Sequence, residues 1–195
     1  MKITFWSSTE YSGFLAGLIR ELNDSGLKAQ QRFQISEASY RSAKYAPARF
    51  LLRFRQYIVY PIELIVALTV RRLKRVNRNQ GGDCDICVVS TNTFYAPLIA
   101  SYLHPNVVHL VYDLFPEAMI HSGKWREGTL KVKIIRWVTK QTLRRSKINV
   151  FLGGRLKNYV ESIYGRVYNS AIIATGADQS LFPEGPLKRK DLCRN

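Results

Sequence analysis

The sequence predicts an α/β domain in which a doubly wound, mostly parallel sheet carries helices on both of its faces. Two observations predict this fold. Short apolar runs alternate along the chain with segments in which apolar residues recur at helical spacing, as in successive strand–helix units. Two of the runs, at 85–90 and 107–113, are continuously apolar, which is typical of strands covered on both sides in a parallel sheet. At 195 residues the chain fits one domain with a sizeable core.

The first part of the chain predicts two strands and two helical segments. An apolar run at 3–7 predicts the first strand, which leads into a loop rich in serine, threonine and glycine. Residues 14–23 have one apolar helical face, and a glycine follows them as a stop signal. The more polar run 29–35 predicts a second strand near the sheet edge. Residues 47–79 are expected to be helical with a break before Pro61, since proline fits the first turn of a helix but not its interior.

The second part repeats the strand–helix unit. Beyond the run at 85–90 we expect strands at 107–113, 147–152 and 171–174, and helices at 94–103, 116–121, 130–145 and 155–164. Ligands of such sheets bind at the carboxyl ends of the strands. Three segments are therefore candidates for a site: the loop after the first strand, the turn at 90–93 with Thr91 and Asn92, and the turn at Asp113.

The loop after the first strand leads into a helix that starts near Gly13. The exposed N–H groups of a helix start attract anions or sugar hydroxyls, which makes Ser12 and Gly13 candidate ligand-binding residues. The alternative is an ordinary strand–helix turn in which Ser12 only caps the helix. The loop lacks a G-x-G-x-x-G pattern, so we expect no dinucleotide site and no cofactor.

The three cysteines are odd in number and sparse, which suits a reducing cytoplasm better than a disulfide framework. Cys84 and Cys87 have zinc-like spacing, but there is no second pair. Cys87 falls in a predicted strand, where it more readily serves as a small buried hydrophobe. We therefore expect no metal site.

The segment Val111-Tyr-Asp-Leu-Phe-Pro-Glu117 places two carboxylates where a buried strand ends and a helix begins. Carboxylates at that edge are where a polar substrate would be held. The alternative is structural: Asp113 caps the helix and Glu117 opposes its dipole.

Charge is the strongest global feature, with 30 basic and 14 acidic residues and a net charge of +16. Such a balance indicates an anionic partner: a membrane surface, a nucleic acid or a phosphorylated substrate. Within 41–79 ten basic residues face a single acid, Glu63, and aromatic and aliphatic residues lie between them. This pattern is typical of a helix that lies on anionic lipid. The residues that we expect to bind the membrane are Arg49, Arg53, Arg55, Arg71, Arg72, Lys74 and Arg75.

A second basic zone lies at 124–166. For either zone the alternative is a merely solvated helix face, or binding to nucleic acid; the interleaved apolar residues favour lipid, and we expect no nucleic-acid partner. The longest apolar stretch, at 57–70, is 14 residues long, shorter than the roughly 20 residues that span a bilayer. We therefore expect a soluble or peripheral protein.

Three passages resemble the N-terminal domain of family-4 glycosyltransferases of the GT-B fold, in particular bacterial enzymes that build surface polysaccharides. The passage at 2–8 resembles their opening strand and acceptor loop, and 111–117 is similar to their D-L-[WYF]-P-E element. The passage at 174–182 is similar to the N-G-V-D-x-x-x-F segment that leads to the interdomain linker. The chain departs from the family in having a single glycine in the first loop and Thr175 in place of asparagine.

The resemblance implies a Rossmann-like acceptor-side domain at 1–175 and the start of a linker or tail at 176–195. It implies transfer of a sugar from a nucleotide sugar, held by a C-terminal donor domain that these residues do not include, to an acceptor that is often lipid-linked. Asp113 would position or deprotonate the acceptor, and Ser12, Gly13 and Glu117 would line the cleft. The expected location is cytoplasmic and peripheral to the inner membrane. The main rival is a non-catalytic subunit that recruits a separate donor chain to the membrane.

Overall fold

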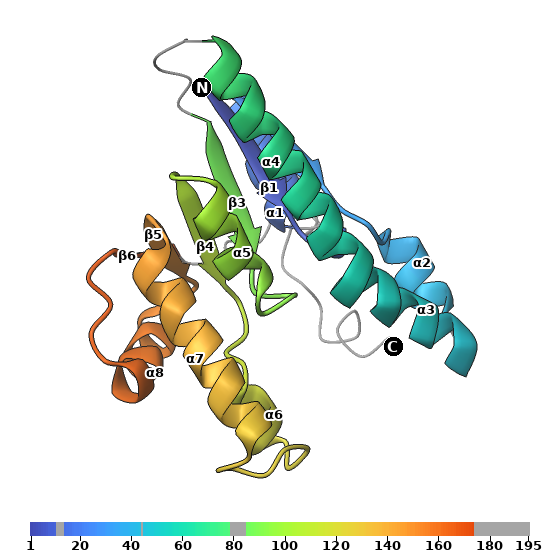
Figure 1. Ribbon diagram of the computed structural model, residues 1–195, viewed down its shortest axis with the longest axis vertical. Coiled ribbons are helices and arrows are strands. Elements are labelled where there is room, and N and C mark those ends of the chain that lie inside the picture. The colour runs from blue at the N-terminus through green and yellow to red at the C-terminus, as the bar shows by residue number, and fades with distance from the viewer. Residues whose placement is uncertain (11–13, 44, 79–84, 174–195) are drawn as a thin grey trace, which may run out of the picture.

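A computed structural model describes residues 1–10, 14–43, 45–78 and 85–173, and it contains one six-stranded, all-parallel sheet with the order β2-β1-β3-β4-β5-β6 (Figure 1). The strands are β1 (Lys2–Trp6), β2 (Lys28–Arg32), β3 (Ile86–Ser90), β4 (Val107–Val111), β5 (Ile148–Phe151) and β6 (Ser170–Ile172). The strand order changes direction between β1 and β3, as a doubly wound topology requires. The predicted fold class, Rossmann-like with helices on both faces, is confirmed.

Helices cover both faces of the sheet. They are α1 (Phe14–Asp24), α2 (Glu37–Ser42), α3 (Ala46–Phe54), the π-helical segment η1 (Arg55–Val59), α4 (Tyr60–Arg78), α5 (Ala96–Leu103), α6 (Glu117–His121), α7 (Leu130–Arg145) and α8 (Gly154–Tyr164). On one face α1 packs through Leu15 against Ile3 and Phe5. On the other, α4 and α5 pack over Trp6 and Val89, and α7 lies beside α5 (Figure 1). Alternate residues of β1 and β3 therefore pack on opposite faces of the sheet, Ile3, Phe5 and Val88 on one face and Trp6, Cys87 and Val89 on the other, as the strand period of two requires.

The long helical segment differs from its prediction in one instructive way. It does not break before Pro61; it widens into η1, whose last turn joins Tyr60 N–H to the carbonyl of Arg55. Proline has no N–H and its ring crowds the carbonyls one turn earlier. The carbonyls of Gln56 and Tyr57 instead accept side-chain hydroxyls. Thr93 Oγ1 donates to Gln56 O (3.2 Å), and the Tyr95 hydroxyl donates to Tyr57 O.

Two further differences concern element ends. The second strand stops at Arg32 rather than at residue 35, although Ile35 still bridges to Thr9. The last strand is β6, and residue 174 of its predicted range lies outside the described residues. The short helix α2, which the sequence did not predict, has Ser36 as its N-cap, with the hydroxyl accepting from Ser39 N–H.

No helix in the described parts of the chain combines the length and the apolar character that crossing a bilayer would require. Cys87 is free and buried in the core under α4. Burial raises the pKa of its thiol to about 12, so it packs as an apolar side chain.

Candidate functional site

Three loops meet at the carboxyl ends of the central strands. Asn92 Nδ2 in the β3–α5 loop donates to Thr9 Oγ1 after β1 (2.9 Å). Thr91 Oγ1 accepts the backbone N–H groups of Tyr112 and Asp113, both at 3.1 Å. One threonine hydroxyl thus holds the turn that carries Asp113, and the predicted meeting of the 90–93 turn with Asp113 is found.

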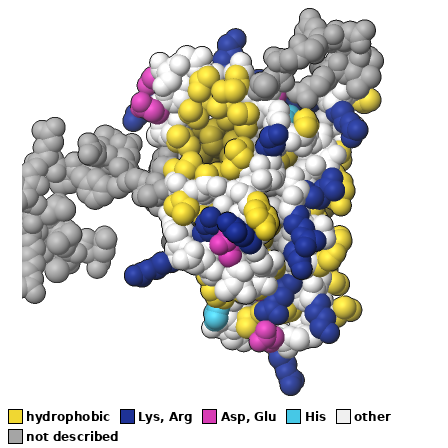
Figure 2. Space-filling view, turned by 90° about the vertical axis from the view of Figure 1, so that its left-hand side faces the viewer, with side chains coloured by type: hydrophobic (Ala, Val, Ile, Leu, Met, Phe, Trp, Pro, Cys, Tyr) yellow, Lys and Arg dark blue, Asp and Glu magenta, His cyan; other side chains and the backbone are white. Residues whose placement is uncertain are grey.

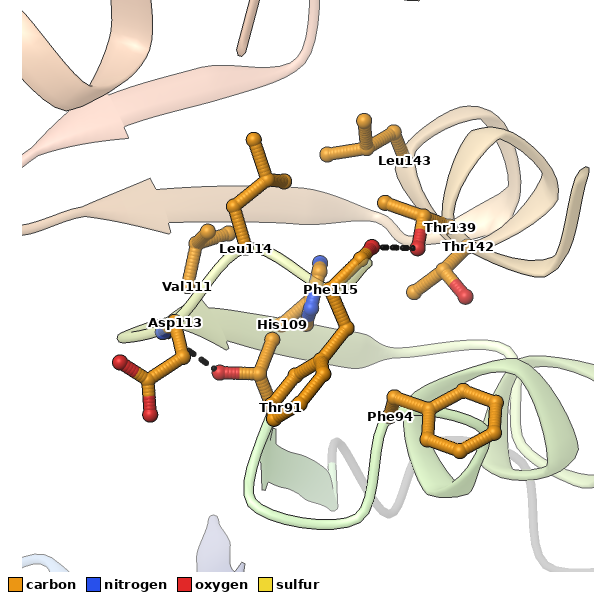
Figure 3. Close-up of a pocket in the computed structure, with 10 residues that line it drawn as sticks. All are labelled: Thr91, Phe94, His109, Val111, Asp113, Leu114, Phe115, Thr139, Thr142 and Leu143. Atoms are coloured by element: carbon orange, nitrogen blue, oxygen red, sulfur yellow. Dashed lines mark hydrogen bonds between the residues drawn. The ribbon is translucent and has the colours of Figure 1, made fainter. Parts of the chain in front are cut away.

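A shallow hollow, partly open to solvent, lies between the β4 end and α7; the space it encloses is about 10 Å³, enough for roughly one water molecule. It is lined by Thr91, Phe94, His109, Val111, Asp113, Leu114, Phe115, Thr139, Thr142 and Leu143. Figure 3 shows the Asp113 carboxylate pointing away from the other lining residues, with the Phe115 ring between Asp113 and Phe94. The lining is mostly apolar with a few polar groups, as in small-molecule sites, but the enclosed space is far below the roughly 300–1,000 Å³ of such sites.

Asp113 is exposed, and its carboxylate makes no hydrogen bond to any residue that the structure describes. The N-cap position of α6 is taken by Pro116, with no side-chain cap. Asp113 therefore does not cap that helix, which was the structural alternative for this residue. A carboxylate that is accessible, held by its backbone and without a structural partner in the described chain is available to a ligand.

His109 is the buried polar group at the floor of the hollow. It pairs with Asn149 across β4 and β5, and its Nδ1 lies 2.9 Å from Asn149 Oδ1. Asn149 Nδ2 donates to the carbonyls of Leu143 and Asn169, so the amide oxygen faces the ring and Nδ1 must be the donor. The imidazole is then neutral with an acceptor at Nε2, and burial lowers the pKa of His109 to about 4.

This burial predicts a pH dependence of stability. Between pH 6.5 and about 4 the unfolded chain protonates His109 whereas the folded chain does not, so the free energy of unfolding falls as the pH falls through that window. The steepest contribution is about 1.4 kcal/mol per pH unit. Urea unfolding from pH 7.5 to 4.5 should show a shallower dependence for His109→Gln than for the wild type. Identical pH slopes in the two proteins would contradict a buried neutral imidazole.

Glu117 lies in a different environment from Asp113. It is 3% exposed. Arg136 Nε donates to its Oε1 (2.8 Å) and the Tyr164 hydroxyl donates to its Oε2 (2.9 Å). It is not among the residues that line the hollow. Both carboxylate oxygens thus serve to tie α6 to α7 and α8.

The other residues predicted to bind the acceptor divide into two groups. Thr91 lines the hollow, and Asn92 lies beside it with its amide on Thr9. Ser12 and Gly13 lie outside the described residues, as do residues 176–195. Sequence reasoning missed His109, Phe94 and the α7 residues; a histidine within the apolar run Val107–Val111 was the one available signal.

The basic zones are arranged in two ways. In the zone at 124–166, Lys131 Nζ lies 3.6 Å from the Trp125 ring centroid and the Arg145 guanidinium 3.8 Å from that of Tyr102, so part of this charge is used within the fold. Figure 2 shows the side of the molecule that faces left in Figure 1, where Lys and Arg far outweigh Asp and Glu and hydrophobic side chains lie among them.

No family model and no curated protein sequence matches this chain.

Proposed function

We propose that this chain is the acceptor-side half of a GT-B-type glycosyltransferase that moves a sugar from a nucleotide sugar to an acceptor at a membrane surface. The observation that carries the proposal is the exposed carboxylate of Asp113 at the carboxyl end of β4, beside the hollow, on a backbone turn whose N–H groups donate to Thr91 Oγ1. Ligands of doubly wound sheets bind at this edge, near the point where the strand order reverses. The resemblance of residues 111–117 to the D-L-[WYF]-P-E element supports the same residue.

Asp113 would accept the proton of the attacking hydroxyl as the new glycosidic bond forms, while the bond between the sugar and the phosphate of the donor breaks and the nucleoside diphosphate leaves. Such general base catalysis requires a carboxylate within hydrogen-bond reach of that hydroxyl. The apolar rings of Phe94 and Phe115 would border the bound acceptor, and the β1 loop, joined through Asn92, would close the other side. A second domain, on the same natural chain or on a partner, would supply the nucleotide sugar.

The proposal also places the protein on the cytoplasmic face of a membrane, as a peripheral protein whose acceptor is lipid-linked. A non-catalytic subunit that brings a donor-domain chain to the membrane is the second candidate. This second candidate is favoured because the chain is strongly basic, whereas the hollow beside Asp113 is small. The two candidates differ in whether Asp113 matters for turnover.

The residues 1–195 alone are expected to bind nucleoside diphosphate sugars with dissociation constants above about 1 mM and to show no transfer. The physical reason is that the proposed donor site lies on another domain. Calorimetry with UDP- and GDP-sugars measures the affinity, and transfer of labelled sugar to membrane lipids by the assembled enzyme measures activity. Micromolar nucleotide-sugar binding by residues 1–195 would overturn this division of labour.

A further inference from the structure

A row of hydrophobic side chains runs along the outward side of α3, η1 and α4. Its members are Leu51, Phe54, Ile58, Ile62, Val66 and Leu73, each between 46% and 61% exposed. They recur every three to four residues as far as Val66, with Leu73 two turns further on, so they share one side of the helix. No residue of α3 or η1 is buried. The row, called here the outer row, is about 33 Å long at the helical rise of 1.5 Å per residue.

Exposed cations lie beside the outer row. Arg53 and Arg55 are exposed on α3 and η1 and flank the row on its two sides at about 100° of turn per residue, and Arg72 is exposed near the far end. Arg49 is also exposed, but it lies on the opposite side of α3 and its Nε donates to the carbonyl of Ala43 (3.2 Å). The single acidic residue of this segment, Glu63, is only partly exposed and accepts a hydrogen bond from the Gln34 amide. Arg71 differs from the others: its Nη1 lies 3.4 Å from Thr4 Oγ1 inside the fold, so we leave it out of the surface.

The combination of an apolar row with neighbouring arginines favours one kind of binding partner over the others. A nucleic acid would need the cations at the centre of contact and would gain little from leucine and isoleucine side chains. A second copy would bring the arginines of one row against those of the other in a protein of charge +16. An anionic bilayer satisfies both parts, since the apolar side chains enter the acyl region and the arginines reach the headgroup phosphates.

We infer that the outer row is a docking surface for an anionic bilayer, and that it lies on the bilayer with the carboxyl edge of the sheet beside it. The second part follows from the attachment of η1. Gln56 Nε2 donates to the Asn92 carbonyl (3.1 Å) and Thr93 donates to the Gln56 carbonyl (3.2 Å). Figure 1 shows α3 extending past the end of the sheet at which the strands finish.

The docked helix and the site loop are therefore one hydrogen-bonded unit. The carbonyl of Asn92 accepts a hydrogen bond from the Gln56 side-chain amide. The preceding residue, Thr91, accepts the backbone N–H of Asp113 at its hydroxyl and so holds the Asp113 turn. A bilayer-bound outer row would hold that turn near the headgroup layer. That this position would bring Asp113 close to a lipid-linked acceptor rests on the proposed function. Docking of the outer row on the bilayer does not depend on sugar transfer.

The test is co-sedimentation of the purified protein with vesicles of phosphatidylcholine alone or with 30 mol% phosphatidylglycerol. We expect strong binding only to the anionic vesicles, with a decrease at 0.5 M salt. The pair Arg53→Gln with Arg55→Gln should weaken binding roughly thirtyfold. Phe54→Ser with Ile58→Ser should weaken it at least tenfold. All four positions are exposed, so circular dichroism and thermal unfolding should be unchanged.

The matched control is Arg20→Gln with Lys28→Gln, which removes the same charge from exposed positions on α1 and β2. It should bind as the wild type. Equal binding to neutral and anionic vesicles, or an equal loss in the control pair, would overturn the inference. So would tighter binding to duplex DNA than to vesicles, or a dimer in light scattering that Phe54→Ser with Ile58→Ser dissociates. No nucleotide sugar is present, so failure of sugar transfer leaves this result intact.

Discussion

In the proposed enzyme, assembled with its donor domain, Asp113→Asn is expected to lower turnover by about a hundredfold or more and to leave the free energy of unfolding within about 0.5 kcal/mol of the wild type. The first part follows from the loss of a proton acceptor, which typically costs a factor of 10² to 10⁴. The second follows from the surroundings of the side chain. It is exposed and bonded to no described residue, and surface changes of this kind are nearly neutral.

The measurement is steady-state transfer of labelled sugar to the lipid acceptor, paired with urea unfolding of the same preparation. Asp24→Asn is the matched control, since Asp24 is an exposed carboxylate at the end of α1, one connection before β2 begins. It should change neither quantity. Turnover of Asp113→Asn within threefold of the wild type would contradict the catalytic role and favour the recruiting subunit.

Thr91 offers a second view of the same site. Its hydroxyl accepts the N–H groups of residues 112 and 113, so it positions the carboxylate through the backbone. Positioning by a few tenths of an ångström matters for general base catalysis. Asp113 and Thr91 thus form one device, built from the ends of two adjacent strands.

Much of the fold could be predicted because the spacing of apolar residues and the helix-capping residues indicate the same element boundaries. The helix α7 has the predicted bounds, since Thr129 accepts from Val132 N–H at its start and Ser146 ends it in extended backbone. The short polar strand β2 and the helix α2 gave weaker signals. The strand has no fully buried residue, so no apolar pattern marks its end, and six residues are too few to show a helical period.

The site could be predicted only as far as the rule for strand ends reaches. That rule brings Thr91 and Asp113 to one edge. It does not reveal that η1 is bonded to the β3–α5 loop, because that contact joins residues 36 or more positions apart. Pro61 was the one indication of this contact in the sequence. Proline frees the carbonyls of Gln56 and Tyr57 from helical hydrogen bonds, and the hydroxyls that donate to them come from Thr93 and Tyr95 in the β3–α5 loop.

The contacts of Glu117 likewise could not be predicted from the sequence. Its place after the D-L-F-P segment suggests a ligand of the cleft, while its surroundings make it a structural anion. Both of its oxygens accept hydrogen bonds, from Arg136 and from Tyr164. Burial, with the charge of Glu117 as the next cause, raises the pKa of Tyr164 well above its ordinary value. The phenol therefore stays protonated and keeps donating.

Glu117→Ala is accordingly expected to reduce the free energy of unfolding by about 2 kcal/mol or more. Removing one partner of a buried ion pair usually costs 3–5 kcal/mol, but the Arg136 side chain is 34% exposed and can recover some hydration. For a chain of this size the melting temperature should fall by about 4–8 °C. Differential scanning calorimetry of the purified protein measures both values.

Glu127 provides the control for Glu117, because it pairs with the same arginine. Arg136 Nη2 donates to Glu127 Oε1 (3.1 Å), but the Glu127 side chain is 67% exposed, and an exposed ion pair contributes at most about 1 kcal/mol. Glu127→Ala should therefore change the melting temperature by no more than about 4 °C. If the two variants melt alike, the buried pair does not stabilise the α6–α7–α8 contact. If Glu117→Gln retains the wild-type melting temperature and loses turnover, Glu117 contacts the acceptor after all, and the hollow must extend past Asp113 toward α8.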